Sequence, residues 1–473
     1  MKIAIVGGSA AGLFASLLLA RTGHDVVVLD RERLELAPEV ESAAEVAFRP
    51  TAPQIVQPHL LMAKCRDLLM RALPDVYDGM LAAGVAEAPI ATHMPSSLSD
   101  TSARPGDELL TTIMSRRSTV DWVLLRTALA EPRVELRGAV RILGLLATPG
   151  QPPRVTGVRT DHGDLQADMV VDATGRRSAI DFWLEEIGAR PTATWRAECG
   201  LAYFSRHYRI RSGAKLPGPA ANRVVQALAE FAIGKWGADN DAVQIAVVPL
   251  AADNRFRTVR HPEVYTAVLR TVPMFAKWLD GLDPITGIFP MAGLHNTLRR
   301  LVVDGIPVAT GLHAIGDSVC TTNPTLGRGL ALALWGAADL ADVTASHDGD
   351  WTAQALMLDK LVGDHLVPYY EDQAAIDAAR LENLRHRVFG HPSPEPPAAG
   401  QDRVTYAELR EAATVDPSAY RALWKVNGMM CLPDEVYLDP EVVACTRAAL
   451  ARPGFSTAIA QPTREELLSA LAA

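Results

Sequence analysis

Residues 2–30 read KIAIVGGSAAGLFASLLLARTGHDVVVLD, and this stretch decides the fold. Residues 2–6 form an Ile- and Val-rich run, as expected of a strand buried on both faces of a parallel sheet. A helix from Ala10 to about Thr22 follows, Gly23 ends it, and His24 to Asp30 has the pattern of a second strand. This order of strand, turn, helix and strand predicts a right-handed β-α-β unit at the start of an α/β domain.

The turn between the first strand and the helix reads Gly7-Gly8-Ser9-Ala10-Ala11-Gly12. Gly7 permits the tight bend, the small Ser9 lets the backbone approach a pyrophosphate, and Gly12 lets helix and strand pack closely. The backbone N–H groups and the positive end of the helix dipole then face the phosphates. The expected cofactor contacts in this turn are Gly7, Ser9, Ala10, Ala11 and Gly12.

An acidic residue, Asp30, stands at the end of the second predicted strand. At this position a carboxylate can accept hydrogen bonds from the ribose of an adenosine. Arg31 follows it and is expected to flank the adenine or the phosphates. Taken with the turn, Asp30 predicts a dinucleotide site.

The remaining pattern divides the chain into interleaved parts. Helical spacing is expected at residues 58–80 and 119–130, and short strands joined by the Gln151-Pro152-Pro153 turn at 134–171. Strand-like runs at 200–211, 224–236 and 242–249, with a helix near 262–279, indicate an inserted sheet that faces the substrate. Later helices are expected at 327–346, 351–388 and from 406 onward, with an exposed connection at Pro392–Pro397.

The predicted fold class is therefore α/β with an α+β insert, in which a Rossmann-like dinucleotide domain is interleaved with a β-sheet substrate domain and followed by a helical C-terminal region. The expected parts are residues 1–198 (dinucleotide domain, first part), 199–295 (substrate domain), 296–345 (return to the dinucleotide domain) and 346–473 (helical region).

Composition excludes several other classes. The chain has 473 residues, 48% of them hydrophobic and 21% charged, which is typical of a folded globular protein. Its net charge of -9 gives no general attraction to nucleic acid or to anionic lipid. Five scattered cysteines without a C-x-x-C pair indicate a reducing cytoplasm and no metal site. The uncharged stretch at 3–20 is no membrane span, because glycines interrupt it at positions 7 and 8.

Two segments near residue 320 indicate which dinucleotide is bound. They read Thr310-Gly-Leu-His-Ala-Ile-Gly316-Asp317-Ser318 and Asn323-Pro324-Thr-Leu-Gly327-Arg-Gly329. Together they resemble the Gly-Asp motif of the p-hydroxybenzoate hydroxylase-like flavoprotein monooxygenases, also called group A. The resemblance implies FAD, with Gly316 and Asp317 at the ribityl chain, Pro324 beside the isoalloxazine ring, and Gly327 and Gly329 near the pyrimidine edge of the ring.

A central segment, residues 170–178, reads VVDATGRRS and looks like a third motif of the same superfamily. There it lies against the pyrophosphate region of FAD, which implies cofactor contacts for Asp172 and Gly175. Aromatic hydroxylases usually have Asp-Gly where this chain has Asp-Ala-Thr-Gly, a form closer to the branch of epoxidases, halogenases and prenyl reductases. The electron source implied is NAD(P)H or a partner flavin reductase.

Four further residues fit the resemblance at the flavin. Arg117 and Arg126 are expected to contact it, and Arg49 and His59 to line it. Each also has an ordinary interpretation, as a helix-surface charge for Arg126 or a helix-start histidine for His59. Tyr203, His207 and Tyr208 in the middle sheet are expected to be structural. Trp424, Met429 and Met430 suit either the border of a hydrophobic pocket or the core, and core packing is expected.

The function implied by the resemblance is insertion of one oxygen atom from O2 into a small hydrophobic organic substrate, by hydroxylation or epoxidation, through a flavin C4a-(hydro)peroxide. Because the flavin carries the reactive oxygen, no catalytic side chain is assigned. Alternatives are an FAD-dependent reductase of a prenyl-type substrate and a flavin-binding protein without chemistry. A halogenase would carry the W-x-W-x-I-P signature, which this sequence lacks.

Overall fold

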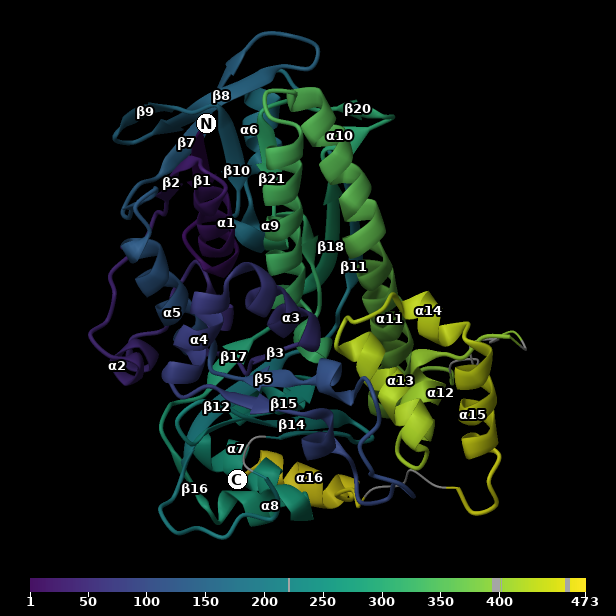
Figure 1. The fold of residues 1–473 in the computed structure, drawn as a ribbon. Helices are drawn as coiled ribbons and strands as arrows, with labels where there is room; N and C mark the ends of the chain where they lie inside the picture. Colours follow the sequence, from purple (N-terminus) through teal and green to yellow (C-terminus); the bar gives the residue numbers. More distant parts are fainter. Residues whose placement is uncertain (220–221, 394–399, 401, 456–459) are drawn as a thin grey trace.

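The computed structural model describes residues 1–219, 222–393, 400, 402–455 and 460–473. The upper part of the molecule in Figure 1 is built around a five-stranded parallel sheet of order β21-β10-β1-β2-β6. Helix α1 (Ala10–Arg21) connects β1 to β2, so the predicted β-α-β unit is confirmed. The strands are β1 (Lys2–Val6), β2 (Asp25–Leu29), β6 (Val134–Arg137), β10 (Met169–Asp172) and β21 (Leu312–Ala314).

The sequence of strand β1 is apolar from Ile3 to Val6 because both faces of the strand are buried there. Ile3 and Ile5 pack into the core formed with α1, α5 (Arg117–Ala130) and α9 (Gly329–Ser346). Ala4 and Val6 pack on the opposite face, against a small antiparallel sheet. Successive residues of a strand point to opposite faces, and both faces of β1 are covered, so no polar residue alternates in it.

That antiparallel sheet has the order β7-β8-β9 and lies beside the N-terminus in Figure 1. The predicted turn at Gln151–Pro153 lies between β7 and β8, as expected. Its strands are β7 (Ile142–Thr148), β8 (Arg154–Thr160) and β9 (Gly163–Gln166).

The helix predicted for residues 58–80 is instead two helices, α3 (Ala63–Ala72) and α4 (Pro74–Ala82). Leu73 between them has an extended φ of -138°, because the ring of Pro74 excludes the helical conformation from the preceding residue. Strand β3 (Leu60–Leu61) precedes α3, and strand β4 (Ala86–Ala88) follows α4. Together with β5 (Thr112–Met114) these strands form a three-stranded sheet of order β3-β5-β4.

A second, antiparallel sheet forms the lower part of the molecule, with the order β13-β14-β15-β12-β16 (Figure 1). The run predicted at 224–236 is a hairpin of two strands rather than one. The helix predicted at 262–279 is likewise two helices, since Pro273 begins the second. The elements are β12 (Tyr203–Ile210), β13 (Arg223–Ala227), β14 (Phe231–Gly237), β15 (Ala242–Pro249), β16 (Leu282–Pro284), β17 (Phe289–Met291), α7 (Pro262–Arg270) and α8 (Pro273–Leu279).

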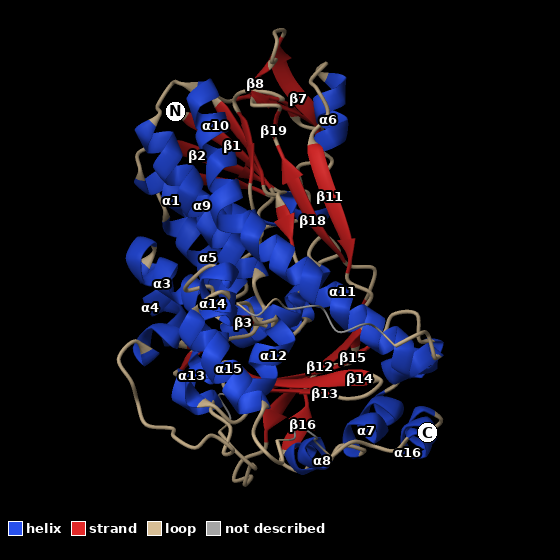
Figure 2. Ribbon diagram, turned by 90° about the vertical axis from the view of Figure 1, so that its right-hand side faces the viewer, coloured by secondary structure: helices blue, strands red, loops and turns tan. Residues whose placement is uncertain are grey.

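Two long antiparallel strands, β11 (Ala193–Glu198) and β18 (His295–Arg300), run between the two parts (Figure 2). The predicted domain limit after 198 falls at the end of β11. The limit after 295 falls inside β18, one residue from its start. Strand β22 (Cys320–Thr321) extends this ribbon and joins it to the Gly-Asp segment.

The helices after residue 346 occupy three places. Helices α10 (Trp351–Leu361) and α11 (Val367–Phe389), separated by a π-helical turn, follow α9 along the molecule. Helices α12 (Tyr406–Ala412), α13 (Pro417–Asn427), α14 (Pro433–Tyr437) and α15 (Pro440–Leu450) share a core with Ile90, Leu98 and Leu110. Helix α16 (Arg464–Leu471) packs on the lower sheet with α7 (Figure 1).

The connection predicted at Pro392–Pro397 lies outside the described residues from 394 onward. Within the described ranges, no helix combines the length and the apolar character that a membrane span requires.

Candidate functional site

A cavity of about 2600 Å³ extends from the carboxyl edge of the parallel sheet to the inner face of the lower sheet. Val6, Leu29 and Ala173 line it, and they stand at or just after the carboxyl ends of β1, β2 and β10. Ligands of open α/β sheets bind outside this edge. The volume exceeds the roughly 300–1,000 Å³ that is usual for one small ligand, so a dinucleotide and a second molecule fit together.

The glycine turn forms one wall of the cavity. Gly7 has a φ of +111°, and a Cβ there would lie 2.5 Å from the carbonyl oxygen of Ala173. Gly12 does not line the cavity. A Cβ on Gly12 would lie 1.8 Å from the carbonyl oxygen of Gly7, so its absence lets α1 start directly against the turn. Of the predicted contacts, Gly7, Ser9, Ala10 and Ala11 face the cavity, and the N-terminus of α1 points into it.

Asp30 lies at the cavity wall with only 7% of its surface exposed. Its carboxylate accepts hydrogen bonds from the backbone N–H of Gly8 at 2.7 Å and of Glu32 at 2.8 Å, and from Arg49 at 3.1 Å. Asp30 therefore joins the glycine turn to the end of β2, and Arg49 holds it there. Arg49 and the exposed Arg31 both line the cavity.

Basic side chains face the phosphate end of the cavity. Arg117 is buried at the start of α5, and it donates to the hydroxyl of Ser9 at 3.1 Å and to Asp121 at 2.6 Å. Arg176 and Arg177, which follow Gly175 in the central segment, also line the cavity. Burial, together with the neighbouring Arg177, lowers the pKa of Arg176. Sequence reasoning quoted these two arginines but did not assign them to the site, although they directly follow a predicted contact.

Asp317 faces the same space from the short helical turn Gly316–Ser318. No residue in the described part of the chain donates a hydrogen bond to its carboxylate. Burial raises the pKa of Asp317, and Arg117 and Arg176 oppose this only in part. A half-buried carboxylate facing a cavity without a protein donor suits hydroxyl groups of a ligand. Gly316 lies behind it, where a Cβ would be 2.9 Å from that of Ala11.

The loop after Asp317 continues the wall. Pro324, Gly327 and Gly329 all line the cavity, and Gly327 takes the left-handed conformation at φ +72°. Gly175 lines it beside Asp317, and its N–H donates to the hydroxyl of Ser318 at 2.9 Å. The central segment and the Gly-Asp segment thus form one part of the wall.

The structure places two predicted contacts elsewhere. Asp172 is fully buried behind the loop, where its carboxylate accepts from the N–H and hydroxyl of Thr174 and from Ser178. It positions the loop instead of lining the cavity. Arg126 points away on α5, with its guanidinium over the ring of Trp122 at 4.7 Å from the centroid. About two and a half turns of α5 separate it from Arg117, because nine residues of helix span about 13.5 Å along the axis.

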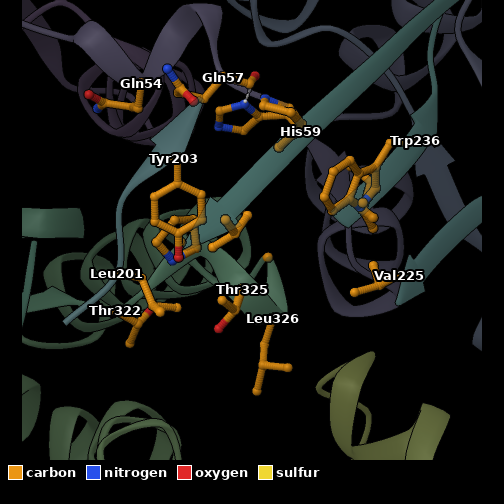
Figure 3. A pocket seen from close by; sticks show the side chains of 18 of the residues that line it. Gln54, Gln57, His59, Leu201, Tyr203, Val225, Trp236, Thr322, Thr325 and Leu326 are labelled. Atoms are coloured by element: carbon orange, nitrogen blue, oxygen red, sulfur yellow. Dashed lines mark hydrogen bonds between the residues drawn. The ribbon is translucent and has the colours of Figure 1, made fainter. Parts of the chain in front are cut away.

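The other end of the cavity is an apolar chamber (Figure 3). Tyr203 comes from β12, Val225 from β13 and Trp236 from β14, and Leu326 and Thr325 face them from the loop after Pro324. The hydroxyl of Tyr203 donates to Asn323, and Asn323 donates to the buried Asp377 at 2.9 Å. Trp424, which sequence reasoning assigned to the core, is buried and also lines the cavity.

His59 lies in the chamber wall near Gln57 and Tyr203 (Figure 3). Burial lowers the pKa of His59 to about 3, so the ring is neutral near pH 7. Its Nδ1 lies 2.9 Å from the carbonyl oxygen of Gln57, and a carbonyl only accepts, so Nδ1 carries the proton. The other ring nitrogen, Nε2, is then an acceptor.

These residues fit FAD. The glycine turn leaves backbone N–H groups and a helix N-terminus for a pyrophosphate, and Arg117 and Arg176 add positive charge. Asp30 and Asp317 offer carboxylates at two separate points of the wall, as the ribose and ribityl hydroxyls of a flavin dinucleotide require. In the described residues, no group of three or more His, Cys, Asp or Glu side chains is arranged to hold a metal ion.

No protein-family model matches the chain. It is similar to Protein Rv3254 of Mycobacterium tuberculosis (strain ATCC 25618 / H37Rv), at 27% identity over 363 residues, which are 69% of each chain.

Several solved structures match a larger share of the chain. The flavin-dependent brominase Bmp2 matches 95% of this chain and 98% of its own, with a TM-score of 0.62 and 15% identity. PqsL, a probable FAD-dependent monooxygenase from Pseudomonas aeruginosa, matches 82% and 98%, with a TM-score of 0.56 and 17% identity. The flavin-dependent halogenase CmlS matches 95% and 76%, with a TM-score of 0.61 and 15% identity. The chain therefore shares its fold with these flavin-dependent proteins, as the motifs at Gly7, Gly175 and Asp317 predict.

Proposed function

We propose that this chain is an FAD-dependent monooxygenase that inserts one oxygen atom from O2 into a hydrophobic organic substrate, by hydroxylation or epoxidation. The observation that carries the proposal is the continuity of the cavity. One space joins the dinucleotide cradle at Gly7, Asp30 and Asp317 to the apolar chamber at Tyr203 and Trp236. A bound cofactor and a substrate would therefore meet inside one continuous volume.

The protein groups have distinct tasks in this proposal. Gly7, Ser9 and Arg117 would hold the pyrophosphate, Asp30 the adenosine ribose, and Asp317 the ribityl hydroxyls. Bound FAD would supply the redox chemistry and the reaction with O2. The loop from Pro324 to Leu326 lines the cavity, and Thr325 and Leu326 face the chamber (Figure 3), so the loop would present the substrate to the flavin ring.

The chamber would orient the substrate and exclude water. Trp236, Val225 and Leu326 give it apolar walls (Figure 3), and apolar walls favour an apolar ligand over water. The Tyr203 hydroxyl is engaged by Asn323, and burial raises the pKa of Tyr203 well above its ordinary value, so the phenol stays protonated.

Electrons would come from NAD(P)H or from a separate flavin reductase. We infer a cytoplasmic location, with which the five free cysteines are compatible.

The test measures both the consumption of O2 and the incorporation of its oxygen atoms into the product. The purified protein is loaded with FAD, reduced with NADH, NADPH or light, and mixed with a panel of apolar aromatic and polyene compounds under ¹⁸O2. A monooxygenase consumes O2 and places one ¹⁸O in the product, as read by mass spectrometry. Substrate reduction without O2 uptake would instead identify a reductase. A product that gains bromine only when bromide is present would identify a halogenase, and no product with any compound and either donor would favour a binding protein.

A further inference from the structure

We propose that the substrate is an organic anion, whose negatively charged oxygen binds Arg223 while its apolar body lies against Trp236 and Val225. This inference rests on the proposed function and names the chemical class of its substrate. Arg223 begins β13, the edge strand of the lower sheet, and it lines the chamber.

Arg223 is placed by the sheet on the chamber side of β13. In the register of the hairpin it stands directly opposite Trp236, and it is two residues from Val225. Residues opposite one another and residues two apart share a face of a sheet. Trp236 and Val225 both point into the chamber (Figure 3), so the three side chains form one continuous surface, with a cation at its end.

The cation of Arg223 lacks a counter-charge. No carboxylate in the described ranges forms an ion pair with it, and its Nε is buried with no hydrogen-bond partner. One Nη donates to the carbonyl oxygen of Thr325 at 3.3 Å, its only side-chain bond to the described protein. Burial lowers the pKa of Arg223, and the phenols of Tyr406 and Tyr420 oppose this only in part. Arg223 as a whole is half-buried, and a charge with a buried, unpartnered Nε is completed by a negative group from the ligand.

Two neighbouring arginines show the contrast. Arg380 lines the same cavity and pairs with Asp377 at 2.9 Å. Arg403 also lines it and pairs with Asp434 at 2.7 Å. Arg223 has no such acidic partner among the described residues, although its Nε is buried.

The ring of His93, which contacts the backbone of Arg223, is uncharged. The backbone N–H of Arg223 donates to Nδ1 of His93 at 3.2 Å, so the proton of that ring is on Nε2, which is 3.2 Å from the hydroxyl of Thr112. Burial lowers the pKa of His93 to about 3, so the ring is neutral. It stacks on Trp424 with 4.8 Å between centroids and an angle of 10°. These two flat rings offer an uncharged surface beside Arg223.

The contact with Thr325 fixes where a bound anion would lie relative to the cofactor. Thr325 follows Pro324 directly, in the loop expected beside the flavin ring. An anion on Arg223 would therefore be anchored close to that loop, and a carboxylate or an ionised enol or phenol would suit a guanidinium. The rest of the molecule would extend over Trp236.

The experiment compares two ligands of the same shape with the FAD-loaded protein. 2-Naphthoate carries a carboxylate, and 2-naphthamide is its neutral analogue. Binding is followed by the change in flavin absorbance. We expect 2-naphthoate to bind at least about tenfold more tightly than 2-naphthamide, as charge-assisted hydrogen bonds predict. In Arg223→Gln this preference is lost, whereas the affinity for 2-naphthamide stays the same.

Arg410→Gln is the matched control, because Arg410 lines the same cavity but is exposed. It should keep the preference for the anion. Equal affinities of the native protein for the two ligands would overturn the inference. An equal loss of the preference for 2-naphthoate in Arg223→Gln and Arg410→Gln would also overturn it. If Arg223→Gln fails to retain FAD, the comparison of the two ligands on the native protein decides.

A free inorganic anion is the other occupant of similar chemistry. Titration with sodium bromide at constant ionic strength distinguishes it, because bromide that binds the native protein more tightly than 2-naphthoate would overturn the assignment to substrate. Native protein that takes up no FAD would contradict the proposed function, whereas FAD-loaded protein without anion preference contradicts only this inference.

Discussion

The two ends of the cavity are built in different ways. At the dinucleotide end the wall comes from short contiguous segments, such as Ser9 to Ala11 and Ala173 to Arg177. At the chamber end, single side chains arrive from separate elements, with Arg223 on β13, Trp236 on β14 and Trp424 on α13. The first end depends on the backbone conformation, and the second on side chains that tertiary structure brings together.

This difference has a physical cause. A pyrophosphate is bound by backbone N–H groups, so the chain must approach it closely, and a few glycines satisfy that need. An organic substrate is bound by the shape and charge of side chains, which many backbones can present. Substitutions at the dinucleotide end should therefore remove the cofactor. Substitutions in the chamber should change ligand binding and leave the cofactor in place.

The largest effect is expected at Gly12. In Gly12→Val the new side chain would collide with the carbonyl oxygen of Gly7, which lies 1.8 Å from the Cβ position, so the turn must open. We expect complete loss of bound FAD, measured as the flavin absorbance that remains after gel filtration.

Gly336→Ala on α9 is the control, since a Cβ at Gly336 has nothing within 4 Å. It should retain full FAD and gain up to about 1 kcal/mol of stability, because alanine favours a helix over glycine. Full FAD retention by Gly12→Val would contradict the assigned role of the turn.

Asp317 comes next. Asp317→Ala removes a carboxylate that has no hydrogen-bond donor in the described protein, and it should weaken FAD binding by about 10- to 100-fold, the usual size for hydrogen bonds to a charged group. Isothermal titration of the apoprotein with FAD measures this change.

The pH dependence of FAD binding tests the same carboxylate. Because burial raises its pKa, Asp317 loses its charge on acidification at a higher pH than an ordinary aspartate does. FAD affinity of the native protein should therefore fall as the pH decreases through this raised pKa. Asp317→Asn should show a flatter profile, and identical profiles would argue against a contact between Asp317 and FAD.

In the chamber, Trp236→Ala should act on ligands alone. Removing this apolar wall should weaken 2-naphthamide binding by about tenfold, since the buried area of an aromatic side chain is worth about 1.5–3 kcal/mol when fully used. FAD content should not change. Trp195→Ala, at an exposed position of β11, is the control and should leave both properties unaltered. Loss of FAD in Trp236→Ala but not in the control would show that the two ends are not independent.

The smallest effect is expected at Arg126. Its guanidinium stacks on Trp122 outside the cavity, so Arg126→Gln should change FAD affinity less than about twofold and lower stability by about 0.5–1 kcal/mol. Titration with FAD and urea unfolding measure the two quantities. A tenfold loss of FAD affinity would contradict this placement and support the flavin contact predicted for Arg126 from the sequence.

The same contrast explains what could be predicted from the sequence. The parallel sheet, the glycine turn and the Gly-Asp segment follow local rules, so Gly7, Asp30 and Asp317 could be named as candidates in advance. Asp172 also stood in a motif, yet a motif does not distinguish a residue that contacts a ligand from one that holds the loop. The hydrogen bonds that Asp172 accepts from Thr174 and Ser178 are revealed only by the structure.

An inserted sheet facing the substrate was expected, but the side chains that meet in the chamber could not be predicted, for a related reason. Arg223 and Trp236 face each other only through the hairpin register, and His93 reaches Arg223 across 130 residues of sequence. Helix limits failed for local reasons instead. Pro74 and Pro273 divide stretches whose hydrophobic spacing is continuous, and proline at the first turn begins a new helix.

The most direct test of the central claim is the amount of FAD bound by the purified chain. The protein is incubated with FAD and freed of excess by gel filtration, and flavin and protein are quantified in the native chain and in Gly12→Val. The account predicts a yellow native protein with one FAD per chain and a colourless variant. A native protein that remains colourless and takes up no FAD would contradict it.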